Sequence, residues 1–398
     1  MTEKNFHIFF DLGSSKIRAT AFNKNDKDQN YFVERDCFSS LKSGQINLIE
    51  AEKKIEDIIF ELEKKTDEYI DSISLMLDAQ EALSINLSLS KKKDGEKIST
   101  EDIQYLVQDA KQQILKFNPE KNIIHIIVKN YKVDDKDYNY LPVGTSCNLF
   151  SIDIIFICFP KLIIKNLENL FYKFQLTINR IFCSSYTKSL SYKEQFTKSE
   201  KISFIDIGYE KTSIAIYYKN KLNSFNVLPV GGNHITKDIS KILSLSNEES
   251  EDIKRSLNKN ISFNEENKTS KIFKDDFLSQ TKHKKETLEL AQKIISARID
   301  EILNLGLDVI KLNENFVDVN KFRIVLIGDG SKILDNNSIY VNDLEYDVEE
   351  ILFFPEKVTT ICESGLILVK GNNKQEVVMI PKKKKTTGFF EKLFHFFK

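Results

Sequence analysis

The chain has 398 residues, and its 58 basic and 59 acidic side chains leave a net charge of −1. This length gives room for two or three domains, and the balanced charge excludes a global positive field for binding nucleic acid. Five scattered cysteines without a Cys-x-x-Cys pair argue against zinc and disulfides and favour a reducing compartment. With no signal peptide and no apolar run of 18 residues, the sequence predicts a cytoplasmic protein without a transmembrane helix.

The chain begins with a predicted strand that ends in a polar turn. Residues 9–16 read Phe-apolar-Asp-apolar-Gly-x-x-Lys, with Asp11 at the end of the strand and Gly13 in the turn. A strand, an acid and a turn glycine are typical of a β-hairpin. Apolar residues at helical spacing over 55–62 predict a helix, and 73–77 predicts another strand.

The next 80 residues differ in character. A strand over 82–89 leads to a lysine-rich loop over 91–97, and Ser99 caps a predicted helix. Two further strands follow, over 123–128 and 151–159. A helix over 162–174, a strand over 176–184 and another helix complete the first half of the chain.

The opening pattern returns 195 residues later. Residues 204–211 again read Phe-apolar-Asp-apolar-Gly-x-x-Lys, now with Asp206 and Gly208, and alternating β-rich residues lead away from both turns. Such a duplication predicts two related lobes, each with a hairpin turn. Two facing turns with backbone N–H groups can hold a polyphosphate, and paired aspartates can hold Mg²⁺ through water or orient an attacking water.

The second half continues with Gly231-Gly232-Asn233 and a largely helical region over 237–312. Within it, 258–285 is polar and predicts a surface hairpin, whereas 288–312 predicts a long amphipathic helix. Residues 324–331 read as a buried strand that runs into a glycine turn, and 361–368 as a helix.

The C-terminus combines a basic linker with an apolar end. Lys382, Lys383, Lys384 and Lys385 precede a segment whose Phe389, Phe390, Leu393, Phe394, Phe396 and Phe397 fall on one face of a helix. A docking helix and an in-plane membrane helix both explain that face, and the lysines favour the membrane, because each contributes about 1 kcal/mol near an anionic leaflet.

These motifs resemble the actin-like ATPase superfamily and, within it, the FtsA division proteins. Residues 11–16 look like the first phosphate motif of that family, 206–212 like the second, and 230–239 like the segment that follows it. The resemblance implies an α/β, actin-like two-lobed ATPase fold of duplicated RNase H-like domains, with an FtsA-type insertion subdomain and a C-terminal amphipathic helix.

The same resemblance implies a division of the chain. Subdomain 1A would combine 1–80, 161–200 and 356–371; 81–160 would be the insertion subdomain 1C; 201–236 with 313–355 would be 2A; 237–312 would be 2B; 372–387 a flexible basic linker; and 388–398 the membrane-targeting helix.

It also implies roles for individual residues. Asp11 and Asp206 would handle Mg²⁺ and the attacking water, as the catalytic pair. ATP would be lined by Gly13, Ser14, Ser15, Lys16, Gly208, Thr212, Gly231, Gly232, Asn233, Glu251, Lys254, Gly328 and Gly330. For Glu251 and Lys254, an exposed helix with an i,i+3 ion pair remains an alternative.

The second motif departs from the family pattern, because Tyr209 and Glu210 replace two glycines, and Asp329 stands between the glycines of the third turn. A β-carbon narrows the space for phosphate and a carboxylate adds like charge, so the sequence predicts weak ATPase activity at most.

Partners follow from the resemblance as well. An FtsA-like protein would self-associate into filaments on the cytoplasmic face of the membrane at the division site, bind the C-terminal peptide of the tubulin-like FtsZ, and meet other division proteins. Two alternatives stay open: an actin-like scaffold for pilus assembly or cell shape, and a small-molecule kinase of the same superfamily.

Overall fold

The structure is a computed structural model that describes residues 4–26, 28–37, 41–42, 45–46, 48–258, 284–313, 322–333, 348–354, 356–357, 359–370 and 376. The predicted surface hairpin over 258–285, most of the basic linker and the apolar C-terminal segment therefore lie outside the described residues, apart from Asn258, Lys284, Lys285 and Glu376.

Lobe one is built on a five-stranded sheet with the strand order β11-β6-β1-β2-β3. Its elements are β1 (Phe6–Leu12), β2 (Lys16–Asn23), β3 (Tyr31–Asp36), α1 (Leu48–Thr66), β6 (Ser72–Leu77), α3 (Lys161–Tyr172), β11 (Thr177–Cys183) and α4 (Ser184–Lys193), with a small hairpin of β4 (Leu41–Lys42) and β5 (Gln45–Ile46). The first three strands are antiparallel, whereas β6 and β11 run parallel to their neighbours.

Lobe two repeats this topology, because its sheet has the order β16-β15-β12-β13-β14 with the same directions. Its elements are β12 (Lys201–Ile207), β13 (Thr212–Tyr218), β14 (Lys221–Leu228), α5 (Gly232–Leu243), α6 (Asn247–Asn258), α7 (Lys284–Lys311), β15 (Phe322–Ile327), η3 (Asp329–Ile333) and β16 (Val348–Phe353), and the short helix η1 (Glu194–Phe196) connects α4 to β12. The last helix, α9 (Thr360–Val369), returns to lobe one, where it packs on β1 and β6. The prediction of two related lobes is confirmed.

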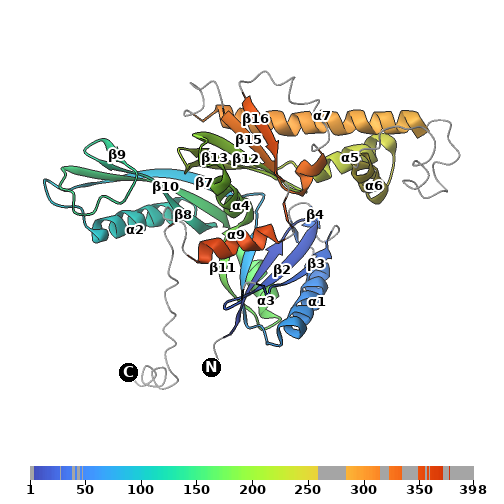
Figure 1. Ribbon diagram of the computed structural model, residues 1–398, viewed down its shortest axis with the longest axis horizontal. Helices are drawn as coiled ribbons and strands as arrows, with labels where there is room; N and C mark the ends of the chain where they lie inside the picture. Colours follow the sequence, from blue (N-terminus) through green and yellow to red (C-terminus); the bar gives the residue numbers. More distant parts are fainter. Residues whose placement is uncertain are drawn as a thin grey trace.

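The insertion subdomain follows β6 in the chain, precedes α3, and projects to the left of the molecule in Figure 1. It consists of β7 (Leu83–Lys92), α2 (Thr100–Phe117), β8 (Lys121–Val133), β9 (Lys136–Tyr138) and β10 (Leu149–Pro160), with the sheet order β7-β10-β8-β9. The predicted cap of α2 is present, because the Ser99 side chain accepts the Asp102 N–H and the Asp102 side chain accepts the Ser99 N–H.

The central layer of the molecule is formed by α4 and α9, which lie between the two large sheets (Figure 1). One apolar core joins lobe one to the inner face of the second sheet, and a second core fills the space between that sheet and α5 and α7. Alternation along β12 explains the division: Ile202 and Phe204 belong to the shared core, and Ile205 and Ile207 to the outer one. Asp206 therefore points toward the space between the lobes.

No helix that the structure describes is long and apolar enough to cross a membrane.

Candidate functional site: a cleft between two equivalent hairpins

The two hairpins have the same register. In β1 and β2, Asp11 lies opposite Arg18, and in β12 and β13, Asp206 lies opposite Ser213. A β-carbon on Gly13 would approach the Lys16 carbonyl oxygen to 2.9 Å, and one on Gly208 would approach the Lys211 carbonyl oxygen to 3.0 Å. The turn of each hairpin thus needs glycine for the same reason, which is the close return of the backbone three residues later.

The two turns face one cavity of about 90 Å³. Asp11, Gly13, Ser14 and Ser15 line it from lobe one, and Asp206, Gly208 and Gly328 line it from lobe two. Both aspartates are almost completely buried. Side chains that the sequence analysis did not assign to the site also line it, namely Arg18, Asp78, Ser184, Lys188, Tyr209, Lys211, Asp329 and Glu356.

A larger cavity of about 310 Å³ adjoins the first. The two share Ser15, Gly208, Tyr209 and Asp329 as lining residues, so they form one cleft. Five further predicted residues line the larger part: Lys16, Gly232, Glu251, Lys254 and Gly330. A volume of this size is typical of small-molecule sites.

Three predicted residues line neither part of the cleft. They contact the second turn, or the backbone beside it, by packing or by hydrogen bonds. A β-carbon on Gly231 would lie 2.6 Å from the Gly208 carbonyl oxygen, so the turn packs directly on this glycine. The Asn233 N–H donates to the Tyr209 carbonyl, and the buried Thr212 hydroxyl donates to the Val230 carbonyl. The start of α5 therefore fixes the shape of the turn.

The third glycine turn reaches the same place. Gly328 has a φ of +91°, and a β-carbon there would lie 2.4 Å from Asp206 Oδ1. A β-carbon on Gly330 would lie 2.7 Å from the Ile207 carbonyl oxygen. Both glycines are required because the turn closes onto the end of β12.

Arg18 ties three acidic groups together across the cleft. Its guanidinium lies 2.7 Å from Glu34, 2.8 Å from Asp329 and 3.5 Å from Asp11. Burial raises the pKa of Asp11 to about 7 although Arg18 opposes this, and Asp11 Oδ2 has no hydrogen-bond partner. Asp329, in contrast, has a side chain that is 42% exposed, and although partial burial disfavours its charge, Arg18 and Lys332 hold its pKa well below the usual value.

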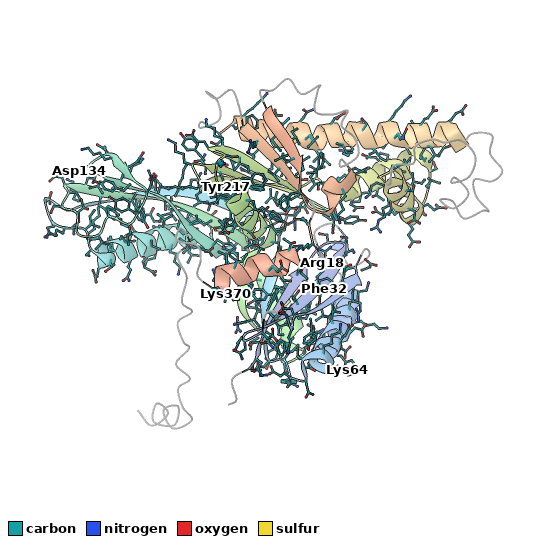
Figure 2. All side chains as sticks on the ribbon, viewed as in Figure 1. Arg18, Phe32, Lys64, Asp134, Tyr217 and Lys370 are labelled. Carbon is teal, nitrogen blue, oxygen red and sulfur yellow. The ribbon has the colours of Figure 1, made fainter. Side chains whose placement is uncertain are left out.

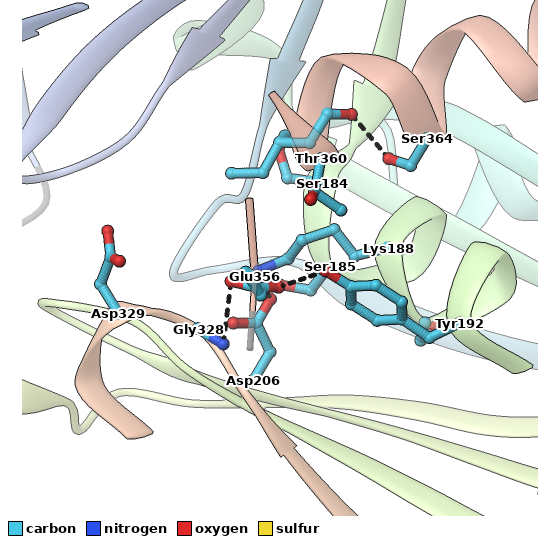
Figure 3. A network of polar contacts seen from close by, with 12 residues as sticks. Ser184, Ser185, Lys188, Tyr192, Asp206, Gly328, Asp329, Glu356, Thr360 and Ser364 are labelled. Carbon is cyan, nitrogen blue, oxygen red and sulfur yellow. Dashed lines mark hydrogen bonds and ion pairs between the residues drawn. The ribbon is translucent and has the colours of Figure 1, made fainter. Parts of the chain in front are cut away.

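Lys188 of α4 forms the second charged cluster (Figure 3). Its ammonium lies 2.8 Å from Asp206 Oδ2 and 3.2 Å from Glu356 Oε1. Burial disfavours the charge of Lys188, but the two carboxylates hold its pKa well above the usual value. Burial, with Glu356 and Asp78 nearby, raises the pKa of Asp206 in spite of Lys188.

Two unusual residues of the second motif are accommodated. The Glu210 carboxylate lines neither part of the cleft and accepts a hydrogen bond of 2.6 Å from the Asn233 amide. The Tyr209 ring forms part of the larger cavity, with the Lys254 ammonium 5.6 Å from its centroid. Lys211 reaches across the cleft to donate to the Asp78 carbonyl of lobe one.

Glu251 and Lys254 make the i,i+3 ion pair of the alternative interpretation, although Lys254 is buried and not exposed, and their contact with a nucleoside stays a prediction. They form the i,i+3 ion pair at 2.6 Å, and both line the larger cavity. Lys254 also donates to the Gly232 carbonyl and to the Thr236 hydroxyl, so α6 is fastened to the start of α5. The predicted membrane-binding residues of the tail lie outside the described residues.

Two family models match the chain. The model described as cell division protein FtsA matches residues 203–331, which contain the second and third turns, and the one described as the SHS2 domain inserted in FtsA matches residues 80–158. Together the matches span more than half of the chain, and curated relatives extend the likeness over most of it. The chain belongs to the FtsA family.

Over the aligned stretches, about a quarter of the residues are identical between this chain and its FtsA relatives. The cell division protein FtsA of Buchnera aphidicola from Acyrthosiphon pisum is 26% identical over 358 residues, which cover 82% of each chain. FtsA of Bacillus subtilis strain 168 is 28% identical over 212 residues, 53% of this chain and 47% of that protein.

A solved structure shows the same fold in another protein. A chain of the PilM–PilN type IV pilus biogenesis complex superposes with a TM-score of 0.58 at 12% identity, covering 91% of this chain and 95% of that one. The chain is thus an FtsA-family protein with the predicted α/β, two-lobed actin-like fold and the FtsA-type insertion subdomain.

Proposed function

We propose that this FtsA-family protein binds ATP in the cleft between its lobes, self-associates on the inner face of the membrane, and tethers the FtsZ ring to it. One observation supports the proposed nucleotide binding. Two equivalent hairpins, from two copies of one sheet topology, line a single cavity. Backbone turns of this kind bind phosphate, and the adjoining larger cavity offers Glu251 and Lys254 to a nucleoside.

Mg²⁺ would accompany the nucleotide, and the two predicted metal residues fit it unequally. Asp11 Oδ2 is buried, makes no hydrogen bond and lies 3.5 Å from the Arg18 guanidinium, a longer contact than the 2.8 Å between Asp206 and Lys188, so this carboxylate keeps room to accept a metal-bound water. Asp206 already carries the Lys188 ammonium at 2.8 Å and does not fit a divalent ion. A metal would supply charge compensation for the phosphates, and Asp11 would be the residue that reaches it.

We expect ATP hydrolysis to be weak at most. Asp206 is held by Lys188, and Tyr209 and Glu210 stand where the family motif has glycines. An aspartate that is paired with a lysine is a poor acceptor for a proton from an attacking water. The proposed role is therefore that of a nucleotide-bound scaffold.

Membrane attachment rests on the sequence of the tail, where four lysines precede a phenylalanine-rich amphipathic segment. The FtsZ contact and the contacts with other division proteins rest on family membership. By that resemblance, the FtsZ peptide would bind within residues 237–312.

The test uses vesicles with anionic lipid, FtsZ of the same organism, and two forms of the protein: the full chain and a chain that ends at Pro381. We expect the full chain to sediment with vesicles and to bring FtsZ with it, whereas the shortened chain binds the FtsZ peptide but stays in the supernatant. Equal sedimentation of both forms contradicts the membrane part, and no binding of FtsZ by either contradicts the tether.

The two alternative functions are not favoured. A small-molecule kinase and a scaffold for pilus assembly or cell shape would both have this fold. Neither function explains why the chain matches both FtsA family models.

A further inference from the structure

A lysine ammonium stands inside the cleft, between two carboxylates, at the end of the second phosphate turn (Figure 3). Lys188 comes from α4, Asp206 from β12, and Glu356 from the segment that precedes α9. The Lys188 side chain is only 4% exposed, and it lines the same cavity as Gly13 and Gly208.

The position of this ammonium is fixed from several sides. Glu356 Oε2 accepts the Gly328 N–H at 3.1 Å, and Glu356 Oε1 accepts the Tyr192 hydroxyl at 3.2 Å. Tyr192 and Lys188 are four residues apart and so lie on one face of α4. Because Glu356 is held by both a turn and a helix, its carboxylate cannot swing away without losing these bonds.

The arrangement does not fit a divalent metal held by Asp206. A metal ligated there would lie close to the Lys188 ammonium, and two like charges repel strongly in a site that excludes water. Displacing the ammonium instead would leave the positive charge of Lys188 buried without its partners. Asp206, the carboxylate that the resemblance implies for the metal, is thus already paired with the Lys188 ammonium.

We propose that the Lys188 ammonium, and not a metal ion held by Asp206, is the cation that meets the nucleotide phosphates at the second turn. Nucleotide affinity then persists when divalent metal is removed. A phosphate that enters between Gly13 and Gly208 accepts a hydrogen bond from the Lys188 ammonium, which also keeps its bond to Asp206. This inference rests on the proposed binding of ATP.

The experiment measures equilibrium binding of ATP to the full chain in excess Mg²⁺ and in EDTA. For the natural protein we expect the dissociation constant to rise by less than about threefold in EDTA, which is about half of one decade in binding. The variant Lys188→Met/Glu356→Gln removes the cation and one carboxylate together, which keeps the local charge balance and protects folding. It should bind at least about tenfold more weakly in EDTA and recover in Mg²⁺.

Two comparisons make the result specific. Lys188→Arg keeps a cation and should keep binding in EDTA, and Lys193→Met removes a lysine of the same helix that lies outside the cleft lining. Loss of tenfold or more by the natural protein in EDTA overturns the inference while leaving ATP binding intact. Unchanged EDTA affinity in the double variant also overturns it. No binding by the natural protein under either condition refutes the proposed ATP site itself, and the inference with it.

Discussion

At the scale of single residues, Gly231 and Gly232 are neighbours, but the space that each leaves for a β-carbon differs. A β-carbon on Gly231 would meet three backbone atoms of the second turn at 2.6–2.8 Å. A β-carbon on Gly232 would meet its nearest neighbour at 3.7 Å, which is ordinary contact. Backbone atoms cannot give way as the end of a flexible side chain can, so only the first glycine is obligatory for packing.

Gly231→Ala should therefore lower the free energy of unfolding by roughly 2–4 kcal/mol, as severe steric substitutions do. Gly232→Ala is the matched control and should change it by about 1 kcal/mol or less, because the position is not left-handed and alanine restricts the unfolded chain. Urea unfolding of both variants measures this. Equal losses in the two would contradict the account of the turn.

The burial of Asp11 makes stability depend on pH. Burial outweighs Arg18 and raises the pKa of the Asp11 carboxyl to about 7 in the folded protein, against about 3.9 in an unfolded chain. Between these values the folded state holds more protons than the unfolded state, so stability falls as pH rises. Asp11→Asn should be more stable than the natural protein at pH 8, by up to roughly 4 kcal/mol, and similar near pH 4.

Asp102 provides a control of opposite sign. It is buried as well, but Lys91 at 2.6 Å and Lys93 at 2.8 Å hold its pKa below the usual value. Asp102→Asn should lose stability at pH 7, with the difference fading in acid. Parallel stability curves for Asp11→Asn and the natural protein, from thermal unfolding between pH 4 and 8, would refute the assignment for Asp11.

At the scale of elements, the register of the hairpins could be predicted and the contents of the cleft could not. Asp11 and Asp206 share a sequence pattern because strand alternation and turn glycines are local features. Lys188 carries no such signal, since α4 is polar in sequence and yet almost wholly buried. Its partners come from β12 and from residue 356, and only tertiary packing brings them together.

The roles of Thr212, Gly231 and Asn233 show the same limit. The family resemblance implies a nucleotide contact for them, but their observed contacts are with the second turn and the backbone beside it. Sequence spacing identifies residues that belong to a site without distinguishing those that line the cavity from those that support it. The overall fold could be predicted from the sequence better than the site, because helices and strands follow from the periodicity of apolar residues.

One residue beyond α9 is fastened to two strands. Glu376 pairs with Ile127 of β8, and its carboxylate lies 2.8 Å from His125 Nδ1 and 2.7 Å from Arg180. Because His125 Nε2 accepts the Cys183 N–H, the proton of the neutral imidazole is on Nδ1 and is donated to Glu376. Residue 376 falls within the segment 372–387 that the resemblance implies is a flexible basic linker, and at this one residue the chain contacts both β8 and β11.

Glu376→Ala should lower the free energy of unfolding by about 2–3 kcal/mol, since it leaves a buried imidazole N–H and a half-buried guanidinium without their acceptor. Glu376→Gln keeps an acceptor oxygen and should lose less than half as much. Urea unfolding midpoints that are unchanged in Glu376→Ala would show that this contact does not contribute to stability.

At the scale of the whole molecule, ion pairs join the lobes across the cleft. The Arg18 guanidinium of β2 and the Asp329 carboxylate of η3 are 2.8 Å apart and belong to different lobes. Arg18 is labelled in Figure 2. Asp329 is partly exposed, so the pair contributes little to global stability and mainly restrains how far the lobes separate.

Asp329→Ala should increase amide hydrogen exchange over residues 328–333 several-fold without changing the unfolding midpoint. Lys332→Ala removes the partner of Asp329 within the same lobe and should leave exchange as it was. High salt should bring the natural protein toward the variant, because it screens the exposed pair. Identical exchange in both variants would mean that Arg18 does not restrain the lobes.

The central claim is that both lobes contribute to one nucleotide site, and ATP titration of single-lobe variants tests it most directly. Ser15→Glu adds negative charge from lobe one, Lys254→Met removes a cation from lobe two, and Lys64→Glu on the outer face of α1 is the control (Figure 2). The account predicts that each cleft variant weakens binding by about tenfold or more, and that the control binds like the natural protein. Undiminished ATP binding by either cleft variant would contradict it.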